Sequence, residues 1–218
     1  MENDPEAMNE FIEEITVNVT EMYRDPYFFK IIREKVLPEI SGKGPLKIWH
    51  AGCSTGEEVY SLAIELKEQN MLDNCIIYAT DINQSVLEQA RKGTYSLENF
   101  RQYENNYRES EGKGNFKNYV EVRNGEAVMD PCLREKMIFS THNLVSDKGF
   151  NSFDLIVCRN VLIYFNKELQ NTVLKTFYDS LNPEGFLALG SKETLLFSPI
   201  QDLMQEHHAQ FKIWKKRV

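Results

Sequence analysis

The sequence lacks the features of secreted, membrane-spanning and nucleic-acid-binding proteins. No stretch approaches the ~18 consecutive apolar residues that span a bilayer, and the acidic first residues lack the basic region of a signal peptide. The 25 Lys and Arg residues are outnumbered by 33 Asp and Glu residues, and no basic cluster occurs apart from KIWKKR at 212–217. A net charge of −8 opposes binding to phosphate backbones, so we do not expect nucleic acid as a partner. Without an apolar span or a signal peptide, we expect a cytoplasmic protein that is not inserted in a membrane.

Cysteine and histidine are sparse and widely spaced. The four cysteines stand at positions 53, 75, 132 and 158, and none belongs to a CxxC pair. The four histidines, at 50, 142, 207 and 208, show no metal-ligand spacing, and we interpret them as structural or exposed. The sequence therefore predicts reduced thiols, no disulfide framework and no bound metal.

Apolar strand-like segments alternate with segments of helical periodicity along the chain. The segments at 46–50, 75–80, 153–159 and 186–190 are typical of buried strands, and those at 59–66, 83–93 and 169–181 of amphipathic helices. This alternation predicts an α/β fold, with a mostly parallel sheet covered by helices on both faces. The ligand of such a sheet lies at the carboxyl ends of its strands.

Two parts of the chain depart from this alternation. Residues 1–43 are expected to form a short helical N-terminal segment, with a helix near 5–16, a loop at 18–26 and a helix at 27–40. Residues 44–218 form the main domain. Within it, a small β subdomain is expected at about 96–140, polar at first and then strand-like at 118–122 and 136–141, with a hairpin turn at Asn124–Gly125. A turn is expected at 182–185, where the sequence reads NPEG.

A small glycine-containing loop, GCSTG at 52–56, follows the first strand. Gly52 and Gly56 suit any strand-to-helix turn, or they allow a ligand to approach the backbone. The loop lacks the lysine and hydroxyl residue of a phosphate-binding P-loop, and Glu57 and Glu58 follow it directly. Two carboxylates favour helix initiation, but together they repel a pyrophosphate. A cationic nucleoside cofactor without phosphate, S-adenosylmethionine (SAM), removes this conflict, with Gly52 as one of its contacts.

Asp81 closes the second strand. A carboxylate at this place accepts hydrogen bonds from ribose hydroxyls in nucleotide-binding sheets. Asp81 alternatively caps the helix that follows it. Its position one strand away from the glycine loop favours the nucleoside reading.

Five segments resemble CheR-type chemotaxis methyltransferases, and they occur in the family's order. They are NVTEMYR (18–24), WHAGCSTGEEVYSLA (49–63), ATDINQSVLEQARKGTY (79–95), THNLV (141–145) and CRNVLIYF (158–165) followed by Gln170. The resemblance covers nearly the whole chain from residue 18. It implies a Rossmann-like class I fold, SAM as cofactor with S-adenosylhomocysteine (SAH) as product, and methylation of glutamate side chains on the cytoplasmic helical bundle of chemoreceptors by a monomeric enzyme.

The resemblance also implies roles for individual residues. Arg24 and Tyr164 are expected near the transferred methyl group, as catalytic residues. The cofactor contacts that the resemblance implies are Asn18, Thr20, Arg24, Glu58, Asp81, Asn143, Leu144, Arg159 and Asn160. Without the resemblance, Tyr164 is interpreted as an ordinary core residue, Arg24 as a surface residue and Asn143 as a turn residue.

The chemistry needs little beyond alignment. A glutamate carboxylate, with a reference pKa of about 4.3, is already ionised near neutral pH and needs no general base. The protein therefore has to align the acceptor oxygen with the methyl group and exclude water.

The chain departs from the family's pattern in several places. Only about 17 residues precede the first matching segment, where family members carry a helical domain with a basic face, and no Lys or Arg occurs before Arg24. The way the acceptor docks is therefore open, including whether the β subdomain binds a receptor peptide. Three local differences are milder. The segment GSKE at 190–193 stands where the family usually has glycine-histidine-serine-glutamate. The segment EMYR stands where the family usually has two phenylalanines before the arginine, and Val59 stands where proline is common.

Three other functions compete with receptor methylation. The first is methylation of another protein or a small molecule, and the second is a non-catalytic module that binds SAM in signalling. A nicotinamide-dependent oxidoreductase is disfavoured, because the dinucleotide fingerprint is broken and Glu57 and Glu58 are expected to face the phosphate position.

Overall fold

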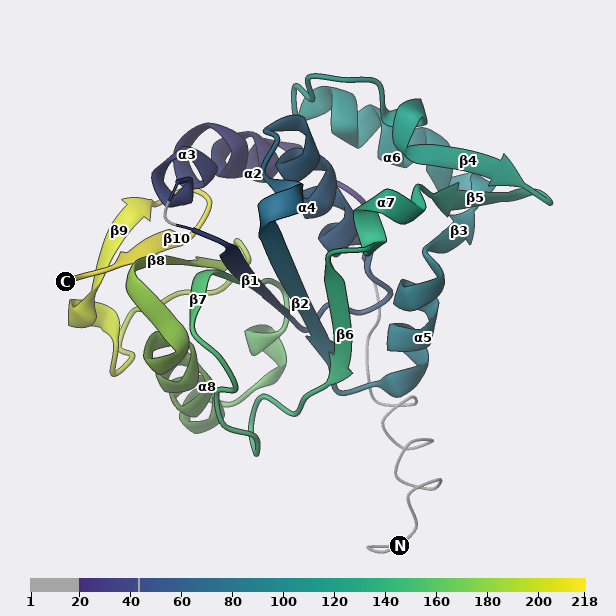
Figure 1. The fold of residues 1–218 in the computed structure, drawn as a ribbon. Helices are drawn as coiled ribbons and strands as arrows, with labels where there is room; N and C mark the ends of the chain where they lie inside the picture. Colours follow the sequence, from purple (N-terminus) through teal and green to yellow (C-terminus); the bar gives the residue numbers. More distant parts are fainter. Residues whose placement is uncertain (1–19, 43) are drawn as a thin grey trace, which may run out of the picture.

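A mostly parallel sheet forms the centre of the molecule in a computed structural model, which describes residues 20–42 and 44–218 (Figure 1). Its seven strands within these residues lie in the order β6 (Met137–Thr141), β2 (Cys75–Asp81), β1 (Leu46–Ala51), β7 (Phe153–Cys158), β8 (Leu181–Leu189), β10 (Ile213–Lys216) and β9 (Met204–His208). The first five are parallel to one another, and β10 is antiparallel to both of its neighbours. The predicted fold class is confirmed, and β9 is a strand that the sequence did not indicate.

Helices cover both faces of the sheet (Figure 1). The long helices are α4 (Glu57–Glu68), α5 (Gln84–Lys92), α6 (Leu97–Glu109) and α8 (Lys167–Ser180). The predicted helix at 27–40 is present as α2 (Pro26–Ile31), a π-helical turn η1 (Ile32–Val36) and α3 (Leu37–Ile40). None of the described helices is long and apolar enough to cross a membrane.

Alternate residues of the central strands supply two separate hydrophobic cores. On β1, Ile48 packs with the core beneath the N-terminal helices and α4, whereas its neighbour Trp49 packs with the core beneath α8. On β7, Leu155 and Ile156 divide in the same way. This follows from the two-residue period of a strand, which turns a continuous apolar segment into two buried faces.

A small antiparallel sheet carries the predicted hairpin. Its strands are β3 (Thr94–Ser96), β5 (Glu126–Met129) and β4 (Val120–Arg123), in that order. Asn124 and Gly125 both have positive φ, 51° and 80°, as a two-residue hairpin turn requires. The hairpin turn is therefore confirmed.

Three local predictions differ from the structure. The segment at 136–141, expected in the β subdomain, forms β6 and pairs in parallel with β2 of the main sheet. The polar stretch from 101, expected as the first part of the β subdomain, lies mostly in helix α6, which buries Tyr103 and Tyr107. The turn expected at 182–185 lies within β8, where the pairing jumps from Phe153–Leu181 to Leu155–Phe186 and leaves a bulge. The predicted helix near 5–16 lies outside the described residues.

Candidate functional site

A cavity of about 620 Å³ opens at the carboxyl ends of β1, β2, β6 and β7. Thr20 and Arg24 of the N-terminal loop line one side of it. Every site residue predicted from the sequence lines this cavity except Asn18, which lies outside the described residues. Those present are Thr20, Arg24, Gly52, Glu58, Asp81, Asn143, Leu144, Arg159, Asn160 and Tyr164. Residues from four strand ends and one distant loop thus meet where a parallel sheet binds its ligand.

The glycine loop is shaped by two positive φ angles and by one close approach. Gly52 has φ 74° and Gly56 has φ 92°. A Cβ on Gly52 would lie 2.4 Å from Cγ2 of Val161, in the loop after β7. The turn and the approach therefore both require glycine at position 52, and the backbone of this residue borders the cavity.

Asp81 holds the glycine loop against β2. Its Oδ2 accepts the N–H of Ser54 at 2.8 Å, and its Oδ1 accepts the N–H of Asn83 at 3.0 Å. Asn83, not Asp81, caps α5, because its side chain accepts the N–H of Ser85. The capping interpretation of Asp81 is thus wrong. Each of its carboxylate oxygens keeps a second acceptor position, and Asp81 lines the cavity.

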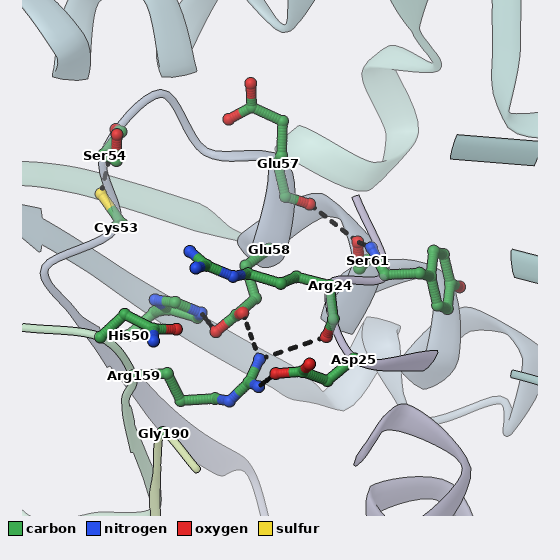
Figure 2. Close-up of polar contacts among 12 residues, drawn as sticks. Arg24, Asp25, His50, Cys53, Ser54, Glu57, Glu58, Ser61, Arg159 and Gly190 are labelled. Carbon is green, nitrogen blue, oxygen red and sulfur yellow. Dashed lines mark hydrogen bonds and ion pairs between the residues drawn. The ribbon is translucent and has the colours of Figure 1, made fainter. Parts of the chain in front are cut away.

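Glu58 lies at the centre of a buried charged network (Figure 2). Its Oε2 accepts a hydrogen bond from Arg159 Nη1 at 2.5 Å, and its Oε1 lies 3.2 Å from His50 Nε2. Burial alone would raise the pKa of Glu58, but the charge of Arg159 and the contact with His50 lower it to about 2. Glu58 is therefore an anion at any physiological pH.

Arg159 ties this network to the N-terminal loop. Besides Glu58, its guanidinium donates to the Asp25 carboxylate and to the Arg24 carbonyl oxygen, the latter at 3.3 Å. Its guanidinium carbon lies 4.1 Å from the centroid of the Phe28 ring. These contacts hold the loop that contains Arg24 at the side of the cavity.

Glu57 does not take part in this network. Figure 2 shows its carboxylate directed away from Glu58, and it accepts a hydrogen bond from the Thr55 hydroxyl at 2.6 Å. Glu57 is absent from the cavity lining, and burial raises its pKa to about 7. The expectation that both glutamates face the ligand position is therefore wrong for Glu57.

The structure supports the alternative interpretation of Asn143 but not that of Tyr164. Asn143 is a turn residue, since its Oδ1 accepts the N–H of Val145 at 3.0 Å, yet it also lines the cavity. Tyr164 is 59% exposed, so its reading as an ordinary core residue is wrong. It lies at the mouth of the cavity.

Sequence reasoning missed the two histidines of the site. His50 and His142 are both buried, and both line the cavity. The sequence analysis considered these histidines only as possible metal ligands and therefore did not place them in the site. Their positions, at the end of β1 and just after β6, were the available signal, because ligand sites lie at strand ends. In the described part of the chain, no cluster of three or more His, Cys, Asp or Glu side chains could hold a metal ion.

Comparison with known proteins shows the family to which this chain belongs. Residues 18–211 match the CheR methyltransferase family, in the region described as its SAM binding domain. The chain belongs to the CheR methyltransferase family. Among relatives of this CheR protein, Cher3 of Pseudomonas putida is 44% identical over 98% of this chain and 78% of its own. The chemotaxis protein methyltransferase of Listeria innocua is 33% identical over 90% of this chain and 72% of its own.

A solved structure supports the fold of this CheR protein. The N-methyltransferase NodS of Bradyrhizobium japonicum, in complex with SAH, superposes with a TM-score of 0.52 over 96% of this chain and 98% of that one. At 11% identity this likeness concerns the fold alone, which is a Rossmann-like methyltransferase fold with added antiparallel strands.

Proposed function

We propose that this CheR protein binds SAM in the cavity and transfers its methyl group to glutamate carboxylates on the cytoplasmic helical bundle of a chemoreceptor. The products are a glutamate methyl ester and SAH. The observation that carries the proposal is the convergence of Glu58, Asp81 and Arg24 on one cavity of about 620 Å³. A nicotinamide-dependent oxidoreductase does not account for this set, and the choice of acceptor is supported by a relative named chemotaxis protein methyltransferase.

The residues present fit SAM. Gly52 borders the cavity, and because it has no side chain, Val161 can pack closely against the glycine loop. Asp81 retains acceptor positions for two ribose hydroxyls. The ionised Glu58 favours a cationic ligand part, and the absence of a basic phosphate cradle in the glycine loop suits a cofactor without phosphate.

When bound, SAM supplies an electrophilic methyl group on a sulfonium. The protein then has three tasks. Asp81 and the loop at Asn143 hold the nucleoside end in place. Arg24 orients a carboxylate, on cofactor or acceptor, through a planar guanidinium suited to two parallel hydrogen bonds. Tyr164 shapes the mouth at which the acceptor oxygen arrives and helps to exclude water. The acceptor is ionised already, so no proton has to be removed.

The test separates cofactor from acceptor. Calorimetric titration with SAM and SAH should show binding by the wild type. Asp81→Ala should weaken this binding ten- to a hundredfold, because hydrogen bonds to a charged group contribute about 1.5–3 kcal/mol. Asp73→Ala is the matched control, because Asp73 is an exposed acid outside the cavity. No binding by the wild type would overturn the proposal.

Transfer is then measured with tritiated SAM and a purified chemoreceptor cytoplasmic fragment. Base-labile label on the fragment is expected, as methyl esters hydrolyse in base. Binding of SAM with base-stable label, or with label only on other molecules, would favour a methyltransferase with a different acceptor. Binding with no transfer at all would favour a non-catalytic SAM-binding module.

A further inference from the structure

Two neighbouring loops form one side of the cavity mouth. Strands β7 and β8 are parallel neighbours, and Cys158 lies opposite Leu189, so the loops that follow them, 159–166 and 190–200, leave the same sheet edge side by side. Buried Glu193 accepts the N–H groups of Val161 and Leu162 at 2.9 and 2.8 Å. These bonds lock the second loop onto the first.

The two loops expose several large apolar side chains. We name this group the apolar rim: Ile163, Tyr164, Leu196 and Phe197, which are 41%, 59%, 50% and 80% exposed. Tyr164 also lines the cavity, so the rim continues into its mouth. Clustered exposed apolar side chains of this kind mark sites of protein interaction.

Phe197 is held in an unfavourable backbone conformation. It has φ 60°, a left-handed conformation that is unfavourable for a bulky residue. Its N–H donates to Gln201 Oε1 at 2.7 Å, and the carbonyl oxygen of Leu196 accepts from Lys167 Nζ at 3.0 Å. The loop is thus fixed in a conformation that leaves the Phe197 ring in solvent. Packing within the described chain does not explain this arrangement.

The exposed charges beside the rim are balanced. Lys167 and Lys192 are exposed, and so are Glu168 and Asp202, while Arg159 and Glu193 are buried. The apolar side chains, and not a net charge, therefore distinguish this surface.

We infer that the apolar rim is the docking surface for the acceptor protein, with Phe197 as its anchor. The partner is the acceptor protein of the proposed function, on whose helical surface apolar side chains flank the accepting glutamate. This inference rests on the proposed function. A carboxylate that belongs to a protein cannot reach the cavity unless the residues around it contact the mouth, and the rim lies at that mouth.

The test compares Phe197→Ala with Val122→Ala. Both residues are exposed apolar side chains, at 80% and 59%, but Val122 lies in β4 of the small sheet. Methylation of the purified chemoreceptor fragment is measured over a range of fragment concentrations, and SAH affinity is measured by calorimetry. Phe197→Ala should raise the KM for the fragment roughly tenfold, as loss of an aromatic anchor does, with unchanged SAH affinity and thermal midpoint. Val122→Ala should change none of these.

Each other outcome overturns the inference in a recognisable way. An unchanged KM in Phe197→Ala leaves the methyltransferase intact and removes the rim as docking surface. A raised KM in Val122→Ala alone places the acceptor on the small sheet. A lowered thermal midpoint in Phe197→Ala means that the ring packs against the protein's own chain. A wild type that binds SAH without methylating the fragment overturns the acceptor class and the rim together.

Discussion

Glu58 and Arg159 form a buried ion pair, with 2.5 Å between Oε2 and Nη1, although 101 residues separate them in the chain. Both side chains are almost completely inaccessible to solvent. Breaking such a pair leaves an uncompensated charge in the interior, which costs about 3–5 kcal/mol. The pair therefore matters for folding as well as for the cavity that it borders.

Glu58→Gln should destabilise the protein at pH 7 by about 3 kcal/mol. The pKa of Glu58 in the folded protein is about 2, against an ordinary value of 4.5, so its ionisation stabilises the fold above pH 4.5. That contribution is lost as the pH falls towards 2. Urea unfolding at pH 7, 5 and 3 should therefore show the gap between wild type and variant closing at the acid end.

The control for Glu58 is Glu88→Gln, an exposed glutamate on α5. Its stability should match the wild type at every pH. A gap for Glu58→Gln that is the same at pH 7 and pH 3 would show that shape, not charge, causes the loss.

Glu57→Gln should have the opposite effect. Burial raises the pKa of Glu57 in the folded protein to about 7, so its ionised form opposes folding above that pH. The wild type gains stability as the pH falls from 7 towards 4.5, where the group is protonated in the folded state. The variant should be more stable than the wild type by about 3 kcal/mol at pH 8, and by much less at pH 5. Equal stability at pH 8 would contradict burial of the charge.

Gly52→Ala should disrupt the loop more than Gly125→Ala does. The two glycines have similar φ, 74° and 80°, but a Cβ on Gly125 would meet nothing within 4 Å, whereas one on Gly52 would lie 2.4 Å from Val161. Gly125→Ala should therefore cost only the conformational strain, about 1 kcal/mol. Gly52→Ala should add about 1–3 kcal/mol from overpacking and weaken SAH binding. Equal losses in chemical denaturation would mean that the backbone yields freely at position 52.

One thiol per native chain should react with Ellman's reagent on the minute timescale, and four after denaturation. All four cysteines are free; Cys132 is partly exposed, and the other three are buried. Burial raises the pKa of the Cys53 and Cys158 thiols well above the ordinary value, which suppresses the reactive thiolate. Cys132→Ser should abolish the native reaction. Rapid reaction of more than one thiol would contradict the burial of Cys53, Cys75 and Cys158.

The sequence predicted what depends on local pattern. The helix at 27–40 was recognisable from its spacing of apolar residues, and Phe28, Phe29, Ile32, Val36 and Ile40 are all buried. The strand ends were recognisable as well, and they pointed to the glycine loop and Asp81; the other site residues were implied by the resemblance to the CheR family. Their roles towards SAM and the acceptor stay predictions.

What the sequence missed depends on non-local pairing. Strand β6 lies at an edge of the main sheet, with only Met137 fully buried, so its pattern does not differ from that of a subdomain strand. Its partner β2 is what distinguishes it. Glu57 and Glu58 are adjacent in the chain, yet one lies beside Thr55 and the other beside Arg159. Only the three-dimensional packing separates two such neighbours.

The cavity is completed by contacts of very long range. Arg159 reaches back 135 residues to the carbonyl oxygen of Arg24, and contacts that join such distant segments form slowly, because a large loop must close first. We therefore expect the site to be assembled late in folding, after the sheet has brought β7 beside β1. A chain caught before that step would hold most of its secondary structure without a place for a ligand, and a ligand that binds this cavity would select chains that have finished folding.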